Sequence, residues 1–175
     1  MKWISLFRAV LNVVYFFSVA SAVAAPLAVF LAARESTLKF EIGGQVLENV
    51  HWSFYVVLVL ALIGYFVFVR MLYLMKQAAR FLNSKTLFSH KIADQITLAG
   101  KNCVLAAVLT KLPAFLYGAF IPLASDSFTN FRYSITFGYG FDSLLVIISF
   151  GFFLMLTGIV MKEVNTLKQE NDLTI

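Results

Sequence analysis

Hydrophobic residues along the chain gather into four long runs, and shorter polar and charged stretches separate these runs. The runs exceed the roughly 18 apolar residues that a helix needs to cross a bilayer. We therefore predict an all-α membrane protein, a four-transmembrane-helix bundle formed as a single domain by residues 1–175. The predicted spans are about 7–33, 52–75, 93–123 and 143–162.

The first span has a basic start and contains the small-residue pattern Ala22-Val-Ala24, which resembles a signal-peptidase site. The apolar run continues without a break through Pro26-Leu-Ala-Val-Phe-Leu31. We therefore expect this helix to be retained in the membrane rather than cleaved from the chain.

Two of the connecting stretches alternate apolar and polar residues, a pattern typical of β-strands. In residues 34–51 the alternation flanks the pair Gly43-Gly44, and glycine readily adopts the positive φ angles of a tight hairpin turn. Residues 125–142 alternate in the same way and are rich in aromatic side chains. The sequence therefore predicts short strand-like loops, which could pair into a small sheet over one end of the bundle.

Basic residues are distributed unevenly between the two sets of connections. Residues 34–51 and 125–142 hold three Lys or Arg, whereas ten lie at the N-terminus, between residues 70 and 101, and after residue 161. Lys and Arg in short loops stay on the cytoplasmic side of a membrane. We therefore expect both termini, the loop 76–92 and the tail 163–175 to be cytoplasmic, and the strand-like loops to be extracytoplasmic.

Composition agrees with a membrane protein, because 61% of the residues are hydrophobic, 13% are charged and the mean hydropathy is +0.85. The net charge of +5 is explained by basic residues that face anionic lipid headgroups or solvent, and no direct nucleic-acid partner is expected. The single cysteine, Cys103, excludes an internal disulfide and the four-helix thiol-oxidising enzymes. No phosphate-binding glycine loop, nucleophile elbow or zinc-protease motif is present. We expect no catalytic residue, metal site, cofactor or enzymatic activity.

One charged residue, Lys111, lies inside the third span. At about 1.5 Å per residue, the 24 residues between Lys101 and Asp126 just cross a hydrocarbon core of about 30 Å. Lys111 is therefore expected near mid-depth. Small residues such as Gly100 and Ala107 share its side of the helix, which indicates that this side points into the bundle.

A lysine inside a membrane is a functional-site hypothesis, because burying it costs on the order of 3 kcal/mol. No Asp or Glu lies in the apolar part of any predicted span. Hydroxyl groups, backbone carbonyls, water or a lipid phosphate are the remaining candidate partners, and the alternative is a lysine that snorkels to the cytoplasmic interface without a role. The candidate ligand-binding residues are Lys111, Tyr15, Ser18, Tyr65 and Thr157.

Three segments resemble those of the bacterial membrane family called domain of unknown function 2975. They are Leu82-Asn-Ser-Lys-Thr-Leu-Phe-Ser89, Ile92-Ala-Asp-Gln-Ile-Thr-Leu-Ala-Gly100 and Leu167-Lys-Gln-Glu-Asn-Asp-Leu-Thr-Ile175. In layout the resemblance covers the whole chain, and the tail carries most of it. It implies a multi-pass protein of the bacterial cytoplasmic membrane whose relatives are often encoded beside a small helix-turn-helix regulator, and it implies no activity.

The tail projects Val164 and Leu167 between charged residues, an arrangement that suits docking of a soluble protein, with a frayed and solvated terminus as the alternative. We favour a non-enzymatic interaction or regulatory protein that acts through its cytoplasmic loop and tail. Its candidate partners are the lipid bilayer, a helix-turn-helix regulator and a second copy of the chain. The candidate partner-binding residues are Arg80, Lys85, Phe88, Leu167, Glu170 and Asp172.

Two other functions fit the same pattern of residues. A small transporter or a lipid- or anion-binding protein would use Lys111 inside the bundle. An envelope self-protection (immunity) protein would act through the extracytoplasmic loops.

Overall fold

The computed structural model describes residues 2–34, 40–42, 45–47, 52–81, 89–124 and 137–173. Nearly all of these residues belong to four long helices, and two short strands lie between the first and second helix. The elements are α1 (Lys2–Arg34), β1 (Phe40–Ile42), β2 (Gln45–Leu47), α2 (Trp52–Phe81), α3 (His90–Ala124) and α4 (Phe137–Leu173).

Each of the four helices is long and apolar enough to cross a membrane, which confirms the predicted set of four long apolar helices. This property rests on length and composition, and the hydropathy is highest in α2 and α4. The qualifying stretches are Trp3–Ala24, Tyr55–Phe81, His90–Leu116 and Leu144–Asn171.

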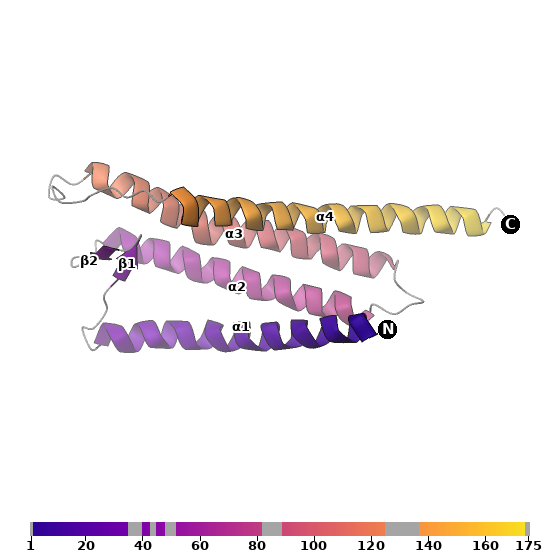
Figure 1. The fold of residues 1–175 in the computed structure, drawn as a ribbon, viewed down its shortest axis with the longest axis horizontal. Helices are drawn as coiled ribbons and strands as arrows, with labels where there is room; N and C mark the ends of the chain where they lie inside the picture. Colours follow the sequence, from indigo (N-terminus) through magenta and orange to yellow (C-terminus); the bar gives the residue numbers. More distant parts are fainter. Residues whose placement is uncertain are drawn as a thin grey trace.

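The helices lie in a row, and successive helices run in opposite directions (Figure 1). α2 packs on both α1 and α3, and α3 also packs on α4. Among the described residues, no extensive contact joins α1 to α3 or α4, so α1 and α4 form the two edges of the row. Both chain ends lie at one end of the helices, and the strands lie at the opposite end (Figure 1).

β1 and β2 form an antiparallel hairpin inside the first segment that the sequence marks as strand-like. Phe40 pairs with Leu47, and Ile42 pairs with Gln45. Residues 43 and 44, the predicted turn, lie outside the described residues.

The second predicted strand-like segment, residues 125–142, is wrong in its last part. α4 already begins at Phe137, so residues 137–142 are helical, whereas residues 125–136 lie outside the described part of the chain. Extending an existing helix by a turn and a half needs no new nucleus, and this favours helix over an isolated strand next to the apolar run of α4.

α2 and α4 continue beyond the predicted spans into charged sequence. α2 reaches Phe81 and α3 begins at His90, so the predicted loop 76–92 is helical at both its ends. The residues just after the apolar run, Lys76-Gln-Ala-Ala-Arg80, are strong helix formers, which explains the extension. α4 continues to Leu173, so most of the tail 163–175 is helical.

α3 begins with a capped first turn. The Ser89 carbonyl oxygen accepts hydrogen bonds from the amides of Ile92 (3.0 Å) and Ala93 (3.2 Å), and the Ser89 hydroxyl lies 3.4 Å from the Ile92 amide. Serine is a preferred cap because its side chain satisfies an amide that has no partner within the helix. The cap therefore stabilises the first turn of α3.

The most deeply buried side chains centre on α3. Ile92, Ala93 and Ala99 are 0% exposed, and Cys103 is 1% exposed. α3 is therefore the central helix, with α2 on one side and α4 on the other. Buried partners in the same cluster are Met71, Leu72 and Ala78 of α2 and Leu154 of α4.

Small residues let α3 and α4 approach each other closely. A Cβ added at Gly100 would lie 2.6 Å from the carbonyl oxygen of Gly151. A Cβ added at Gly158 would collide with the Thr97 hydroxyl and lie 2.8 Å from the Ala93 carbonyl oxygen. Membrane helices associate through such contacts because their apolar surface gains little by leaving lipid.

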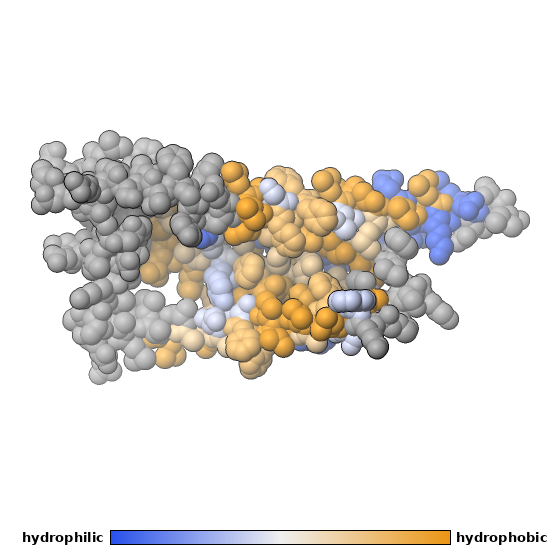
Figure 2. All heavy atoms as spheres, viewed as in Figure 1, coloured by the Kyte–Doolittle hydropathy of each residue, from blue (hydrophilic) through white to orange (hydrophobic). Residues whose placement is uncertain are grey.

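The outer surface of the row is strongly apolar. Phe16 and Phe17 of α1 are 70% and 65% exposed, and Phe153 of α4 is 62% exposed. Figure 2 shows hydrophobic residues over the middle of the molecule and a hydrophilic group at the C-terminal end of α4. Lipid can solvate such a belt, whereas a water-soluble monomer rarely exposes so large an apolar patch.

Candidate functional site

Cations from all four helices are held by specific contacts at the end of the row that carries both chain ends. We call this region the basic end and define it by Arg8, Lys76, Arg80, Lys91 and Lys162. The Lys76 ammonium lies 4.5 Å from the centre of the Tyr15 ring, and the Lys91 ammonium lies 4.8 Å from the centre of the Phe81 ring. Cation–π contacts of this kind fix the position of an ammonium without neutralising its charge.

Arg8 of α1 closes the C-terminus of α2. Its Nε donates to the Ala79 carbonyl oxygen (2.7 Å), and its Nη2 donates to the Arg80 carbonyl oxygen (3.3 Å). The last four carbonyls of a helix have no amide partner within it and carry partial negative charge, so a guanidinium is well suited to this place. Arg8 therefore ties α1 to the end of α2.

A chain of polar contacts runs from α1 through α2 to α3. The Tyr15 and Tyr73 rings pack with their centres 6.0 Å apart. The Gln77 side-chain Nε2 donates to the Tyr73 hydroxyl (2.8 Å), and the Gln95 side-chain Nε2 donates to Gln77 Oε1 (2.9 Å). Hydrogen bonds thus join α2 to α3 in this layer, and the ring contact of Tyr15 with Tyr73 joins α1 to it.

An ion pair between Asp94 and Lys162 joins α3 to the start of the tail. The two side chains are 61% and 43% exposed, so water screens the pair and its contribution is at most about 1 kcal/mol. The pair therefore adds little to the packing of α4 on α3.

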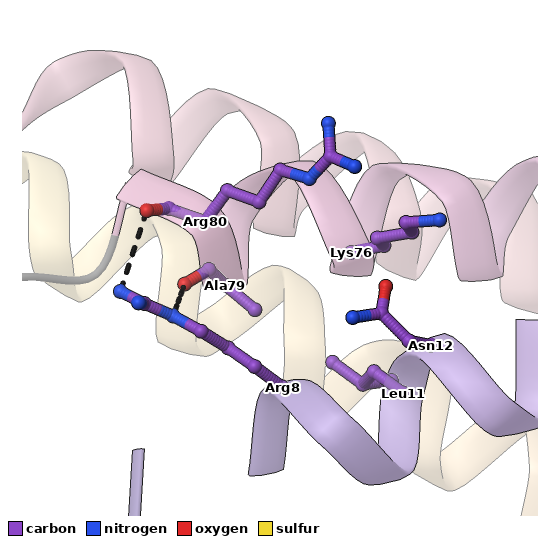
Figure 3. A pocket seen from close by; sticks show the side chains of 6 residues that line it. All are labelled: Arg8, Leu11, Asn12, Lys76, Ala79 and Arg80. Atoms are coloured by element: carbon purple, nitrogen blue, oxygen red, sulfur yellow. Dashed lines mark hydrogen bonds between the residues drawn. The ribbon is translucent and has the colours of Figure 1, made fainter. Parts of the chain in front are cut away.

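A small cavity of about 40 Å³ lies between α1 and α2 at the basic end. Figure 3 shows that the Arg80 side chain lies back along α2 toward Lys76, and that the Asn12 amide faces the same region from α1. Arg8 points the other way, to the end of α2 (Figure 3). The lining residues are Arg8, Leu11, Asn12, Lys76, Ala79 and Arg80.

The predicted ligand-binding residues are brought together only in part. The Tyr65 hydroxyl donates to the Ser18 carbonyl oxygen (3.1 Å) and links α2 to α1. The Thr157 hydroxyl donates to the Phe153 carbonyl oxygen of its own helix (2.8 Å), and Tyr15 lies against Lys76. In the described part of the chain, no hydrogen bond given by the structure connects these residues to Lys111.

Lys111 itself is exposed, although the sequence places its side of the helix toward the bundle. That prediction holds for Gly100 and Ala107, which are buried, and is wrong for Lys111. Gly100 is buried by its close contact with Gly151 of α4, and Lys111 lies about three turns further along α3, beyond that contact.

The predicted partner-binding residues lie at the basic end or on the tail wherever the structure describes them. Arg80 lines the cavity, and Leu167 and Glu170 are exposed on the part of α4 that extends beyond the row. Asp172 lies in the last turn of α4. Lys85 and Phe88 lie outside the described residues.

Sequence analysis missed the grouping of Arg8, Asn12, Lys76 and Gln77. A usable signal was present, because Arg8 opens the first span and Lys76 closes the second. Antiparallel neighbours bring the start of one span beside the end of the next, so charges at those two positions are expected to meet. Counting charges by their distance from the span boundaries would have found this group.

Replacing Arg8 with glutamine is expected to lower the free energy of unfolding by about 1.5 kcal/mol, the order of a hydrogen bond to a charged group. The terminal carbonyls of α2 lose their charged donor in this variant. Thermal unfolding in a mild detergent measures the change. The control is Arg70→Gln, which removes an exposed cation of α2 that does not line the cavity. Equal losses in both variants would contradict a capping role for Arg8.

Replacing Lys111 with leucine is expected to stabilise the chain in lipid. An exposed lysine within an apolar span costs up to about 3 kcal/mol, and the variant recovers part of that free energy. The unfolding midpoint in lipid nanodiscs tests this, with Lys101→Leu as the matched exposed lysine nearer the basic end. A lower midpoint for Lys111→Leu alone would show that Lys111 has a stabilising partner.

No family model, no curated protein and no solved structure matches the chain.

Proposed function

We propose that the chain is a four-span protein of a bacterial cytoplasmic membrane that acts without catalysis, as an interaction or regulatory protein. In this proposal both termini and the basic end face the cytoplasm, and the β1–β2 hairpin faces the opposite side. Two observations support the orientation: both chain ends lie at the basic end, and most Lys and Arg residues outside the apolar spans lie on that side.

The observation that carries the proposed function is the part of α4 that extends beyond the other helices (Figure 1). From Lys162 to Leu173 this helix would reach about 18 Å into water. Leu167 is 62% exposed there, and Val164, three residues earlier and on the same side of the helix, is 39% exposed. We propose that these two side chains dock against a groove of a soluble protein.

The resemblance of the tail and loop to the family called domain of unknown function 2975 supports one class of partner. We propose that the chain is a member of that family and that its soluble partner is a small helix-turn-helix regulator. Binding at the tail would hold such a regulator at the membrane, away from DNA.

The proposal predicts that a small helix-turn-helix protein is encoded beside this chain, and co-expression of the two proteins tests it. Leu167→Asp is expected to reduce co-purification at least about tenfold, because removing one buried anchor of an interface costs more than 1.4 kcal/mol. Lys168→Gln changes a neighbouring exposed residue and is expected to keep the complex. Absence of a complex, or equal recovery with Leu167→Asp, would contradict docking on the tail.

The transporter and self-protection functions remain predictions. The transporter hypothesis needs Lys111 to be enclosed by the bundle, whereas Lys111 is exposed in the described part of the chain. Self-protection would depend on the β1–β2 hairpin, so a phenotype confined to variants of residues 40–47 would favour it.

A further inference from the structure

The cavity between α1 and α2 combines three cations with a polar amide and has no established ligand. We propose that it binds the phosphate group of an anionic phospholipid, with Lys76 and Arg80 as the charged contacts and Asn12 as the hydrogen-bonding side chain. Arg8 also lines the cavity, while its guanidinium is held by the carbonyls at the end of α2.

The local charge favours an anion. Among the described lining residues, none carries a carboxylate, and the sequences of α1 and α2 contain no Asp or Glu. Lys76 and Arg80 are four residues apart on one side of α2, so their charges repel each other. An anion between them would remove this repulsion and would form charge-assisted hydrogen bonds with both side chains.

The contacts that position the cations also hold them ready for a ligand. The Tyr15 ring keeps the Lys76 ammonium in place, and Tyr73 packs on Tyr15. Figure 3 shows Arg80 directed along α2 toward Lys76 and Asn12 directed at the same space from α1. The three side chains therefore come from two helices and line the same cavity.

The volume of the cavity limits the size of the group that can bind. A cavity needs at least about 10–15 Å³ to hold one water molecule. The cavity of about 40 Å³ therefore has room for a small polar group and not for a whole lipid. A phosphate that enters from the side would leave the remainder of its molecule outside the cavity.

The surface beside the cavity indicates a lipid rather than a free phosphate. On α1, Phe16 lies one turn beyond Asn12 on the same side of the helix and is 70% exposed. An acyl chain can cover this side chain while the headgroup reaches the cations. Basic pockets between membrane helices at the cytoplasmic side are suited to anionic headgroups for this reason.

The test uses the full chain in a non-ionic detergent and three probes: dioleoylphosphatidylglycerol, dioleoylphosphatidylcholine and inorganic phosphate. The rise in unfolding midpoint with probe concentration gives an apparent dissociation constant. We expect phosphatidylglycerol to bind the wild type, with about fivefold weaker binding in Arg80→Gln and about 30-fold weaker binding in the double variant Lys76→Gln/Arg80→Gln. Arg70→Gln, an exposed cation of α2 outside the cavity, is expected to bind as the wild type does.

Each outcome decides the proposal. Equal effects of inorganic phosphate and phosphatidylglycerol, both lost in the cavity variants, would support the phosphate site and overturn the lipid as its source. Equal binding of the two lipids, or equal weakening by Arg70→Gln and Arg80→Gln, would overturn the site. Arg80 is exposed, so the single variant decides even if the double variant fails to fold. The cavity lies on α1 and α2, so this result is independent of docking at α4.

Discussion

Replacing Gly100 with valine is expected to lower the free energy of unfolding by about 3 kcal/mol, the upper end of the usual range for overpacking a close contact. A Cβ at this position would lie 2.6 Å from the Gly151 carbonyl oxygen, 2.7 Å from Met155 Cγ and 2.8 Å from the Met155 amide nitrogen. Two of these three atoms belong to the backbone of α4, so no change of rotamer relieves the clash. The helices must move apart, and the packing of α3 on α4 is lost.

The matched control adds the same number of carbon atoms where there is space. Ala20→Leu enlarges an exposed position of α1 by three carbons, as Gly100→Val enlarges α3, and is expected to change the unfolding midpoint little. Unfolding in dodecylmaltoside, followed by circular dichroism, measures both variants. A wild-type midpoint for Gly100→Val would show that α3 and α4 do not pack closely in solution.

Truncating Ile92 to alanine is expected to cost about 3 kcal/mol, within the range for removing a large aliphatic side chain from a packed core. Ile92 is 0% exposed and belongs to the same cluster as Met71, Leu72 and Ala78 of α2. The Ser89 cap holds the first turn of α3, so the turn cannot easily shift to fill the cavity.

Ile159→Ala removes the same atoms from a side chain of α4 that is 49% exposed, and it serves as the control. We expect this variant to lose less than a third of the unfolding free energy that Ile92→Ala loses. Detergent or lipid solvates position 159 whether it holds isoleucine or alanine. The two variants are compared by chemical unfolding. Similar losses would indicate that α2 and α3 are not joined by this cluster.

The four helices could be predicted from the sequence because membrane spans depend on local composition. Runs of apolar residues and the short strands on each side of residues 43–44 follow from neighbours along the chain. The start of α4 at Phe137 was not predicted, because the local alternation of aromatic residues indicates a strand. The adjoining apolar run favours continuation of the helix instead.

The arrangement of the helices could not be predicted, because it depends on contacts between residues far apart in the sequence. Small residues on α3 indicate that some helix approaches closely, yet they do not say which one. The structure assigns Gly100 to α4 and the Leu109–Thr110 segment to α2, and Lys111, about three turns beyond Gly100, is exposed. The cavity beside Arg8 likewise depends on a contact between the start of α1 and the end of α2.

The central claim is that four spans place both termini on the cytoplasmic side and the hairpin on the other side. It is tested most directly by labelling single cysteines, introduced in a Cys103→Ala background, with a maleimide that does not cross membranes. Lys2→Cys and Lys168→Cys are predicted to react only in inverted membrane vesicles, and Glu41→Cys only in intact spheroplasts. Labelling of Glu41→Cys from the same side as the termini, or labelling of the two termini from opposite sides, would contradict the account.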